Sequence, residues 1–320
     1  MNTIGVLTSG GDAPGMNAAV RAVVRTACEH GMKVYGINRG YAGLIDDDMT
    51  ELNLRSVSDI IHRGGTMLRS ARCLDFKTEE GIQKAIDTCH KRGIEGLVVI
   101  GGDGSFRGAR DLSLKGIPCV GVPATIDNDI VCTDYTIGYD TCLNTIMQMV
   151  DRVRDTIESH SRCMVVEVMG NRAGDLTLNS GIAVGATAIV IPEFKSDIEQ
   201  HVIDRIRRTQ QTDKKHFLIM VAEGVGGVQE LSDKIQKELG IESRAIVLGH
   251  VQRGGSPTVR DRVIASQMGY KAVQLLIKGE GNRVVVMRSE EILDLDIFAA
   301  LNMEKRISRE LYDIAHVISI

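Results

Sequence analysis

The sequence predicts an α/β protein with mostly parallel sheets, and three observations indicate this class. Short β-branched runs alternate with longer segments of helical period, and Gly, Asp, Ser or Thr marks each junction, which is typical of parallel βαβ units. The 320 residues suffice for about two ordinary domains, and 43% of them are apolar. Because no Pro/Ser-rich linker separates two halves, we expect the domains to be joined by several chain crossings rather than one hinge.

The strands and helices are expected to alternate from the first residues onward. Strands buried on both faces are predicted at 4–8, 34–38, 96–100, 119–122, 164–168, 188–191, 217–222 and 284–287. Helices are predicted at 15–30, 79–91, 104–114, 140–158, 174–184, 197–210, 230–239 and 261–278. Each predicted helix starts at Gly, Asp or Glu. No repeat of fixed period is evident.

Charge and cysteine content exclude several classes of function. The 38 basic and 42 acidic residues leave a net charge of −4, so no global basic field is available for nucleic acid or an anionic membrane. The longest charge-free stretch, between Asp175 and Glu193, is too short and too polar to span a bilayer, and no secretory signal is expected. Seven cysteines without CxxC spacing predict free thiols in a reducing cytoplasm, with neither a disulfide framework nor a zinc site.

Two glycine-rich turns follow predicted strands, at the sheet edge where α/β proteins bind ligands. In TSGGDAPGMN (8–17), backbone N–H groups and a helix start could cradle a phosphate, although a tight turn capped by Asp12 is an equal alternative. In VVIGGDGSFRG (98–108), Asp103 is flanked by glycines. It is either a helix cap or a carboxylate for the Mg²⁺ that a bound nucleotide would bring.

A third turn, VPATIDND (122–129), carries acids directly after a strand. In extended chain the spacing of Asp127 and Asp129 would aim both carboxylates the same way. Their repulsion would be offset by a metal, a cation or a proton, which suits general acid–base catalysis. An Asx-type turn of solvated polar residues, Thr125 among them, is the alternative.

Positive charge for a phosphorylated ligand must come from elsewhere in the chain. No Gly-Lys dipeptide is present, which excludes a Walker A loop, and neither the kinase HRD and DFG motifs nor G-x-G-x-x-G occurs. Arginines near turns are candidates because the guanidinium grips a phosphate through two hydrogen bonds. They are Arg72, Arg162, Arg244 and Arg253, the last near His250 in LGHVQRGGSP (248–257) and expected to follow a strand.

Together these segments closely resemble the bacterial ATP-dependent 6-phosphofructokinase family. The shared motifs run in the family's order over essentially the whole chain: GVLTSGGDAPGMNA (5–18), IHRGGT (61–66), SARC (70–73), VVIGGDGS (98–105), TIDND (125–129), SHSR (159–162), VEVMG (166–170), AEGVG (222–226) and LGHVQRGGSP. The resemblance implies two three-layer α/β/α domains. A larger nucleotide-binding domain would comprise 1–138 and 251–301, and a smaller sugar-phosphate-binding domain 139–250 and 302–320.

The resemblance also implies the activity and the site residues. The reaction would be phosphoryl transfer from ATP to the 1-hydroxyl of fructose 6-phosphate, with Asp127 as general base, Asp129 and Thr125 beside it, Arg72 offsetting charge and Asp103 holding Mg²⁺. ATP would contact Gly11, Arg72, Cys73, Phe76, Gly102, Asp103, Gly104, Ser105 and Gly108. Fructose 6-phosphate would contact Thr125, Asp127, Asp129, Arg162, Met169, Gly170, Glu223, Arg244, His250 and Arg253. Arg162 and Arg244 would reach in from a neighbouring subunit of a homotetramer.

Sequence differences within the family bear on the donor and on regulation. Pyrophosphate-dependent relatives typically carry an acid at the position of Gly104 and a lysine at that of Ala124, so the two small residues here favour ATP. An allosteric site for ADP or phosphoenolpyruvate is implied at Arg21, Arg25, Arg55, Asp59, Arg154, Lys214 and Lys215. Its metal-binding glutamate is replaced by Thr187, which puts the effector response in question. The arginine that follows VEVMG in the family is Asn171 here, and Arg172 comes next.

Two other functions remain open at this point. One is a kinase for a different sugar phosphate, such as tagatose 6-phosphate, or an enzyme that uses pyrophosphate. The other is a sugar-phosphate or nucleotide sensor without chemistry, although sensing has no need of a base beside a metal.

Overall fold

The computed structural model describes residues 1–194, 198–304 and 307–319. The chain forms two compact units, neither of which is continuous in sequence. The larger unit comprises Met1–Ile126, Ile130–Thr141 and Arg253–Lys305, and the smaller comprises Asp127–Asp129, Cys142–Gln252 and Arg306–Ile320.

The larger unit is built on a seven-stranded sheet in the order β11-β10-β5-β4-β1-β2-β3. Its central strands are parallel, while β3 and β11 pair antiparallel at the two edges. The strands are β1 (Thr3–Ser9), β2 (Lys33–Ile37), β3 (Met49–Leu52), β4 (Gly96–Gly101), β5 (Cys119–Pro123), β10 (Arg283–Arg288) and β11 (Glu291–Asp296). All of β4 and nearly all of β1 are buried, as expected for strands covered on both faces.

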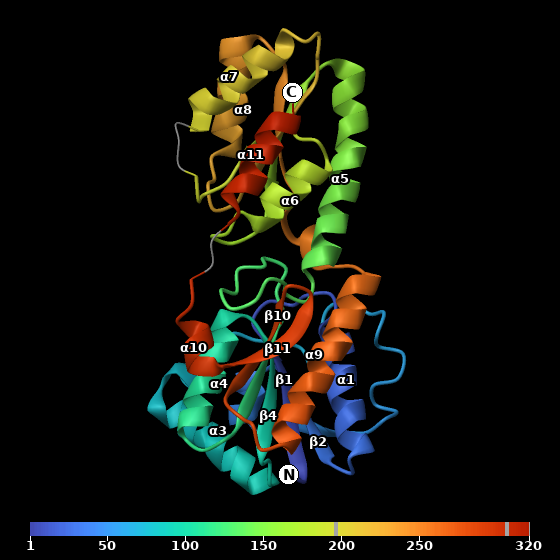
Figure 1. Ribbon diagram of the computed structural model, residues 1–320, viewed down its shortest axis with the longest axis vertical. Helices are drawn as coiled ribbons and strands as arrows, with labels where there is room; N and C mark the ends of the chain where they lie inside the picture. Colours follow the sequence, from blue (N-terminus) through green and yellow to red (C-terminus); the bar gives the residue numbers. More distant parts are fainter. Residues whose placement is uncertain (195–197, 305–306, 320) are drawn as a thin grey trace. The chain divides into compact units, whose positions relative to one another are not determined.

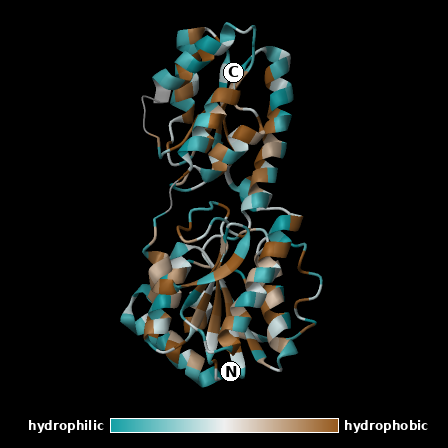
Figure 2. Ribbon diagram, viewed as in Figure 1, coloured by the Kyte–Doolittle hydropathy of each residue, from teal (hydrophilic) through white to brown (hydrophobic). Residues whose placement is uncertain are grey.

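Helices cover both faces of this sheet (Figure 1). On one face α1 (Met16–Glu29) packs against α9 (Val259–Ile277), and on the other lie α3 (Glu79–Arg92), α4 (Asp103–Leu114) and α10 (Ile297–Leu301). The short α2 (Tyr41–Ile45) and the 3₁₀ turn η1 (Asp75–Lys77) pack against α3. Figure 2 shows hydrophobic strands between helices that carry both hydrophobic and hydrophilic residues. The main hydrophobic core therefore lies between the sheet and the helices that cover it.

The smaller unit has a parallel sheet in the order β7-β8-β6-β9. Its strands are β6 (Cys163–Val168), β7 (Ala188–Val190), β8 (Phe217–Ala222) and β9 (Ser243–Val247). One face carries α7 (Ile198–Gln210) and α8 (Val228–Leu239), and the other carries α6 (Asp175–Ala183) with α11 (Arg309–Ile318) packed on it. The long α5 (Tyr139–His160) enters this unit after its first turn, and the 3₁₀ turn η2 (Gly249–Arg253) follows β9.

The predicted α/β class with two three-layer, mostly parallel units is confirmed. Several elements were not predicted from the sequence: β3, β11, α2, α10 and α11. The strand expected before Arg253 is β9, which ends at Val247, and Arg253 itself is the last residue of η2. Position 197, the predicted start of a helix, lies outside the described residues, and α7 is described from Ile198.

No helix within the described ranges combines the length and the hydropathy that crossing a membrane requires.

Candidate active site

A cavity of about 580 Å³ opens at the carboxyl ends of β1, β4 and β5 in the larger unit. It brings together the predicted nucleotide contacts except Asp103: Gly11, Arg72, Cys73, Phe76, Gly102, Gly104, Ser105 and Gly108. Thr125, predicted to contact the sugar phosphate and the group in transfer, also lines the cavity. Residues that were not anticipated also line it, among them Tyr41, Lys77, Arg107 and Arg110. No sequence motif marked Tyr41, because its role depends on how α2 packs. The position of the cavity agrees with the rule that α/β sheets bind ligands at this edge.

Aromatic stacking forms one wall of the cavity. The rings of Tyr41 and Phe76 stack with centroids 4.0 Å apart, and the Tyr41 hydroxyl donates to the carbonyl oxygen of Ser105 at 2.6 Å. A Cβ at Gly108 would lie 2.7 Å from the Tyr41 ring, so only glycine permits this approach of α4. Burial raises the pKa of Tyr41, which therefore stays a hydrogen-bond donor.

The two glycine turns present open backbone to the same cavity. A Cβ at Gly102 or Gly104 would meet no other atom within 4 Å, so the space beside them is available to a ligand. At Gly11 the situation differs, because a Cβ would collide with the guanidinium of Arg253. Arg253 thus lies against the first glycine turn, where its charge can reach a phosphate held by backbone N–H groups.

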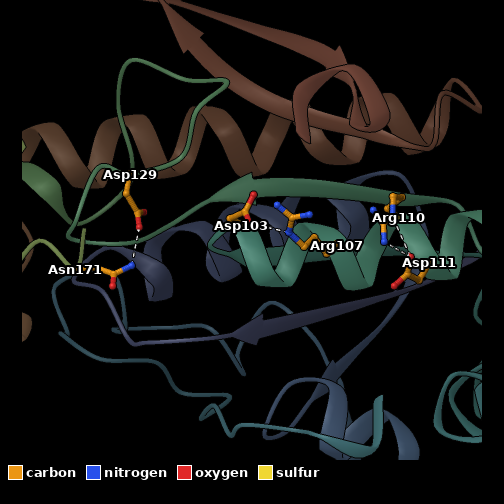
Figure 3. A network of polar contacts seen from close by, with 6 residues as sticks. All are labelled: Asp103, Arg107, Arg110, Asp111, Asp129 and Asn171. Atoms are coloured by element: carbon orange, nitrogen blue, oxygen red, sulfur yellow. Dashed lines mark hydrogen bonds and ion pairs between the residues drawn. The ribbon is translucent and has the colours of Figure 1, made fainter. Parts of the chain in front are cut away.

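Asp103 is the first residue of α4 and forms an ion pair with Arg107, one turn later, at 2.9 Å (Figure 3). Its side chain remains 42% exposed. Within residues 1–194, 198–304 and 307–319, no three His, Cys, Asp or Glu side chains gather as a metal cage. A single accessible carboxylate beside a phosphate cradle nevertheless fits Mg²⁺, which is usually held by one or two carboxylates together with phosphate oxygens.

The TIDND segment departs from the expected geometry. The chain bends at residues 126–127, and Asn128 adopts a left-handed φ of 50°. The prediction that extended chain aims Asp127 and Asp129 the same way is therefore wrong. Asp127 is 8% exposed, whereas Asp129 is half-buried and accepts a hydrogen bond from the Asn171 amide at 3.3 Å (Figure 3).

In the smaller unit a short loop after β6 carries Met169, Gly170 and Asn171. One Glu223 oxygen accepts from the backbone N–H groups of Gly170 (3.2 Å) and Asn171 (2.6 Å), and the buried Gln252 accepts from that of Met169 (3.1 Å). Glu223 therefore fixes the loop. Together with burial, its charge raises the pKa of nearby Glu167.

Two predicted phosphate ligands share one acid. Arg162 precedes β6 and Arg244 lies on the neighbouring β9, and their guanidinium groups pair with Glu242 at 2.8 and 3.0 Å. Hydrogen bonds from both arginines lower the pKa of Glu242. The smaller unit thus presents a cationic pair whose charge is partly offset within the chain.

His250 is exposed on η2. On the turn after Gly170, Arg172 is exposed, whereas the neighbouring Asn171 side chain contacts Asp129.

The predicted effector residues are distributed over both units. Arg21 and Arg25 lie on α1, and Arg55 and Asp59 lie in the turn after β3; Arg154 lies on α5, and Lys214 and Lys215 precede β8. Burial, and then the charges of Arg154 and Arg205, lower the pKa of Lys214. Thr187 is completely buried. Its hydroxyl accepts from the Leu218 N–H and its carbonyl accepts from Arg205, so the side chain is not presented to a ligand.

The site combines glycine turns at the ends of parallel strands with arginines and an accessible acid. This combination defines a class of proteins that bind phosphorylated ligands. Comparison with known proteins identifies the family within this class. The phosphofructokinase family model matches residues 3–276. Relatives named "ATP-dependent 6-phosphofructokinase" are 54% identical over 320 residues in Clostridioides difficile and 55% identical over 320 residues in Shouchella clausii, with 100% of both chains covered in each case. The chain belongs to the phosphofructokinase family.

Solved structures agree with this assignment. Phosphofructokinase from Saccharomyces cerevisiae is 34% identical with a TM-score of 0.88; the match covers 94% of this chain and 45% of the yeast chain. A pyrophosphate-dependent phosphofructokinase from Marinobacter aquaeolei, 21% identical, shares the fold with a TM-score of 0.87 over 97% of this chain and 86% of its own. The resemblance inferred from the sequence motifs is confirmed.

Proposed function

We propose that the protein transfers the γ-phosphoryl group of ATP to the 1-hydroxyl of fructose 6-phosphate, giving fructose 1,6-bisphosphate and ADP. The observation that carries this proposal is the cavity with open space beside Gly102 and Gly104, in a chain 54% identical over its full length to a relative named for the same reaction. Because Gly104 and Ala124 are small, the cavity keeps room for a nucleoside triphosphate.

The donor is held in the larger unit. Gly11, Gly102, Gly104 and the N-terminus of α4 supply N–H groups and a positive dipole to the phosphates, while Tyr41 and Phe76 offer an apolar wall. Mg²⁺, when bound with the nucleotide, neutralises phosphate charge. Asp103 would hold the metal, since it is the accessible carboxylate at this helix start.

The acceptor is held by the smaller unit. Arg162 and Arg244 bind the 6-phosphate, reaching the site from a neighbouring subunit of a homotetramer, and His250 and the loop of Met169 and Gly170 hold the sugar. Glu223 fixes that loop through its backbone amides. Arg253 also contacts the sugar phosphate.

Asp127 acts as the general base. It accepts the proton of the 1-hydroxyl as that oxygen attacks the γ-phosphorus, and Asp129 supports this region. Thr125 contacts the group in transfer, and Arg72 and Arg253 offset the charge that develops between donor and acceptor. A cytoplasmic location follows for an enzyme that uses these metabolites, and ADP or phosphoenolpyruvate is the candidate effector.

The proposal is tested by measuring ADP release with MgATP against a panel of acceptors, including fructose 6-phosphate and tagatose 6-phosphate, and with pyrophosphate as an alternative donor. Asp127→Asn should lower kcat about 10²- to 10⁴-fold, the range for loss of a general base. The control is Asp155→Asn, the same chemical change at an exposed site on α5, which should leave kcat unchanged.

Three outcomes would contradict the proposal. Near-normal turnover by Asp127→Asn removes the assignment of the base. Preference for pyrophosphate removes ATP as donor. Binding of both ligands without ADP release identifies a sensor rather than an enzyme.

A further inference from the structure

A completely buried acid in the larger unit has no role in the scheme above. Asp261 lies in the first turn of α9, with 0% of its surface exposed. One carboxylate oxygen accepts from the Tyr135 hydroxyl and the Gly138 N–H, both at 2.7 Å. The other accepts from the N–H and the hydroxyl of Thr141, at 2.9 and 2.5 Å.

Capping of α9 does not explain this acid. Thr258 is the N-cap residue, and its hydroxyl oxygen accepts from the Asp261 N–H. The carboxylate instead faces residues 135–141, more than a hundred positions earlier in the chain. Burying a carboxylate is costly unless hydrogen bonds compensate, and here all of these bonds come from that one segment. Asp261 therefore fixes the conformation of residues 135–141.

That segment in turn holds Thr125. The Thr125 N–H donates to the carbonyl of Ile137 at 3.1 Å, and the hydroxyl of Thr136 donates to the carbonyl of Thr125 at 2.7 Å. The Ile137 N–H donates to the carbonyl of Pro123 at 3.0 Å. The conformation of the backbone between β5 and Asp127 therefore depends on the segment that Asp261 fixes.

The first glycine turn rests on the same segment. A Cβ at Gly15 would lie 2.6 Å from the Ile137 side chain and 3.5 Å from the Asp261 Cβ, and one at Gly138 would lie 2.7 Å from the Ala13 Cβ. These close approaches leave the end of the 8–15 turn little freedom relative to residues 137–138. The end of the first glycine turn and the backbone at Thr125 therefore both rest on residues 136–138.

We propose that Asp261 is a positioning residue for phosphoryl transfer. Through residues 135–141 it holds Thr125 and the end of the first glycine turn in fixed positions relative to each other. The kinetic consequence rests on the proposed function, whereas the structural consequence does not. A misplacement of about 1 Å at reacting groups can cost roughly 10²-fold in rate.

The test is Asp261→Asn. Whichever way the amide is turned, its NH₂ group faces the backbone N–H of Gly138 or of Thr141, so one buried donor loses its acceptor. We expect kcat to fall about 10- to 100-fold, with the KM for MgATP within about threefold of wild type. Independently of activity, hydrogen exchange should accelerate at least about tenfold in peptides covering 121–127 and 135–141.

Two further variants separate positioning from loss of stability. Leu276→Ala creates a cavity at the far end of the same helix, where Leu276 is 1% exposed, and should lower Tm while preserving kcat and exchange at 121–127. Thr136→Val removes the side-chain bond to the Thr125 carbonyl and should reproduce the selective loss of kcat with little change in Tm. It also keeps the test available if Asp261→Asn does not fold.

Unchanged exchange at 121–127 in Asp261→Asn would overturn the proposal. So would loss of kcat in Leu276→Ala in proportion to Tm, since that result makes Asp261 merely structural. Wild-type protein that turns over no sugar phosphate would remove the proposed function, and the exchange result would still decide whether Asp261 fixes Thr125.

Discussion

The open space beside Gly104 allows a sharp test of donor choice. Gly104 is the second residue of α4, and a Cβ there meets nothing within 4 Å. Gly104→Asp places a carboxylate in the cavity where the nucleotide phosphates are proposed to lie. Two unit charges about 4 Å apart repel by roughly 4 kcal/mol at an effective dielectric of 20, and the open mouth of the cavity reduces this to about 3 kcal/mol. The KM for MgATP should then rise about 10²-fold.

Stability should change little, because an acid in the first turn of a helix is favourable by about 0.3–1 kcal/mol. Gly104→Asn carries the same bulk without charge, and Gly104→Ala adds only a methyl group, so together they separate charge from size. The assay is a coupled measurement of ADP release at saturating fructose 6-phosphate, with Tm measured on the same samples. If Gly104→Asp keeps its KM for MgATP within about threefold of wild type, the phosphates do not lie beside Gly104 and the donor site is misplaced.

Other expectations follow from particular contacts. Glu242→Gln removes the acid that competes with a phosphate for Arg162 and Arg244, so the KM for fructose 6-phosphate should fall about two- to tenfold; an increase would show that the acid orients the arginines instead. Because Thr187 is buried and its hydroxyl is hydrogen-bonded, MgADP should activate weakly or not at all in initial-rate assays; strong activation at MgADP concentrations that saturate its binding would contradict this. Burial, and then the charge of neighbouring Arg205, lowers the pKa of His316 from 6.5 to about 4. Below pH 6.5 His316 therefore binds a proton in the unfolded chain but stays neutral in the folded chain until the pH approaches 4. Between pH 7 and 4.5 the free energy of unfolding of wild type should therefore fall about 1–2 kcal/mol more than that of His316→Phe in urea titrations, and parallel curves would refute it.

The sequence was informative where burial is uniform. β1, β4 and β8 are covered on both faces and appear as continuous apolar runs, so their positions could be read directly. The edge strands β9 and β11 are partly exposed and mix apolar with charged residues, as in Glu291–Asp296. Such segments become strands because a neighbour offers hydrogen bonds, and single-sequence patterns do not contain that information.

The residues of the candidate site also differ in how clearly the sequence indicates them. Glycine turns carry their own signal, since only glycine leaves the space found at Gly102 and Gly104. The contacts of Tyr41 and Asp261 depend on segments distant in sequence, so no local motif indicated them. The error at Asp127 and Asp129 arose from assuming extended chain across Asn128, whose left-handed backbone turns the segment.

The interleaving of the two units bears on how the chain folds during its synthesis. Strand β10 pairs with β5, and α9 covers α1, yet both come from the last quarter of the sequence. While the ribosome is still producing the smaller unit, β5 presents unpaired backbone at a sheet edge and α1 exposes its apolar face. The nascent protein therefore passes through a stage in which one side of its main sheet is uncovered, when chaperones or early subunit association would matter most.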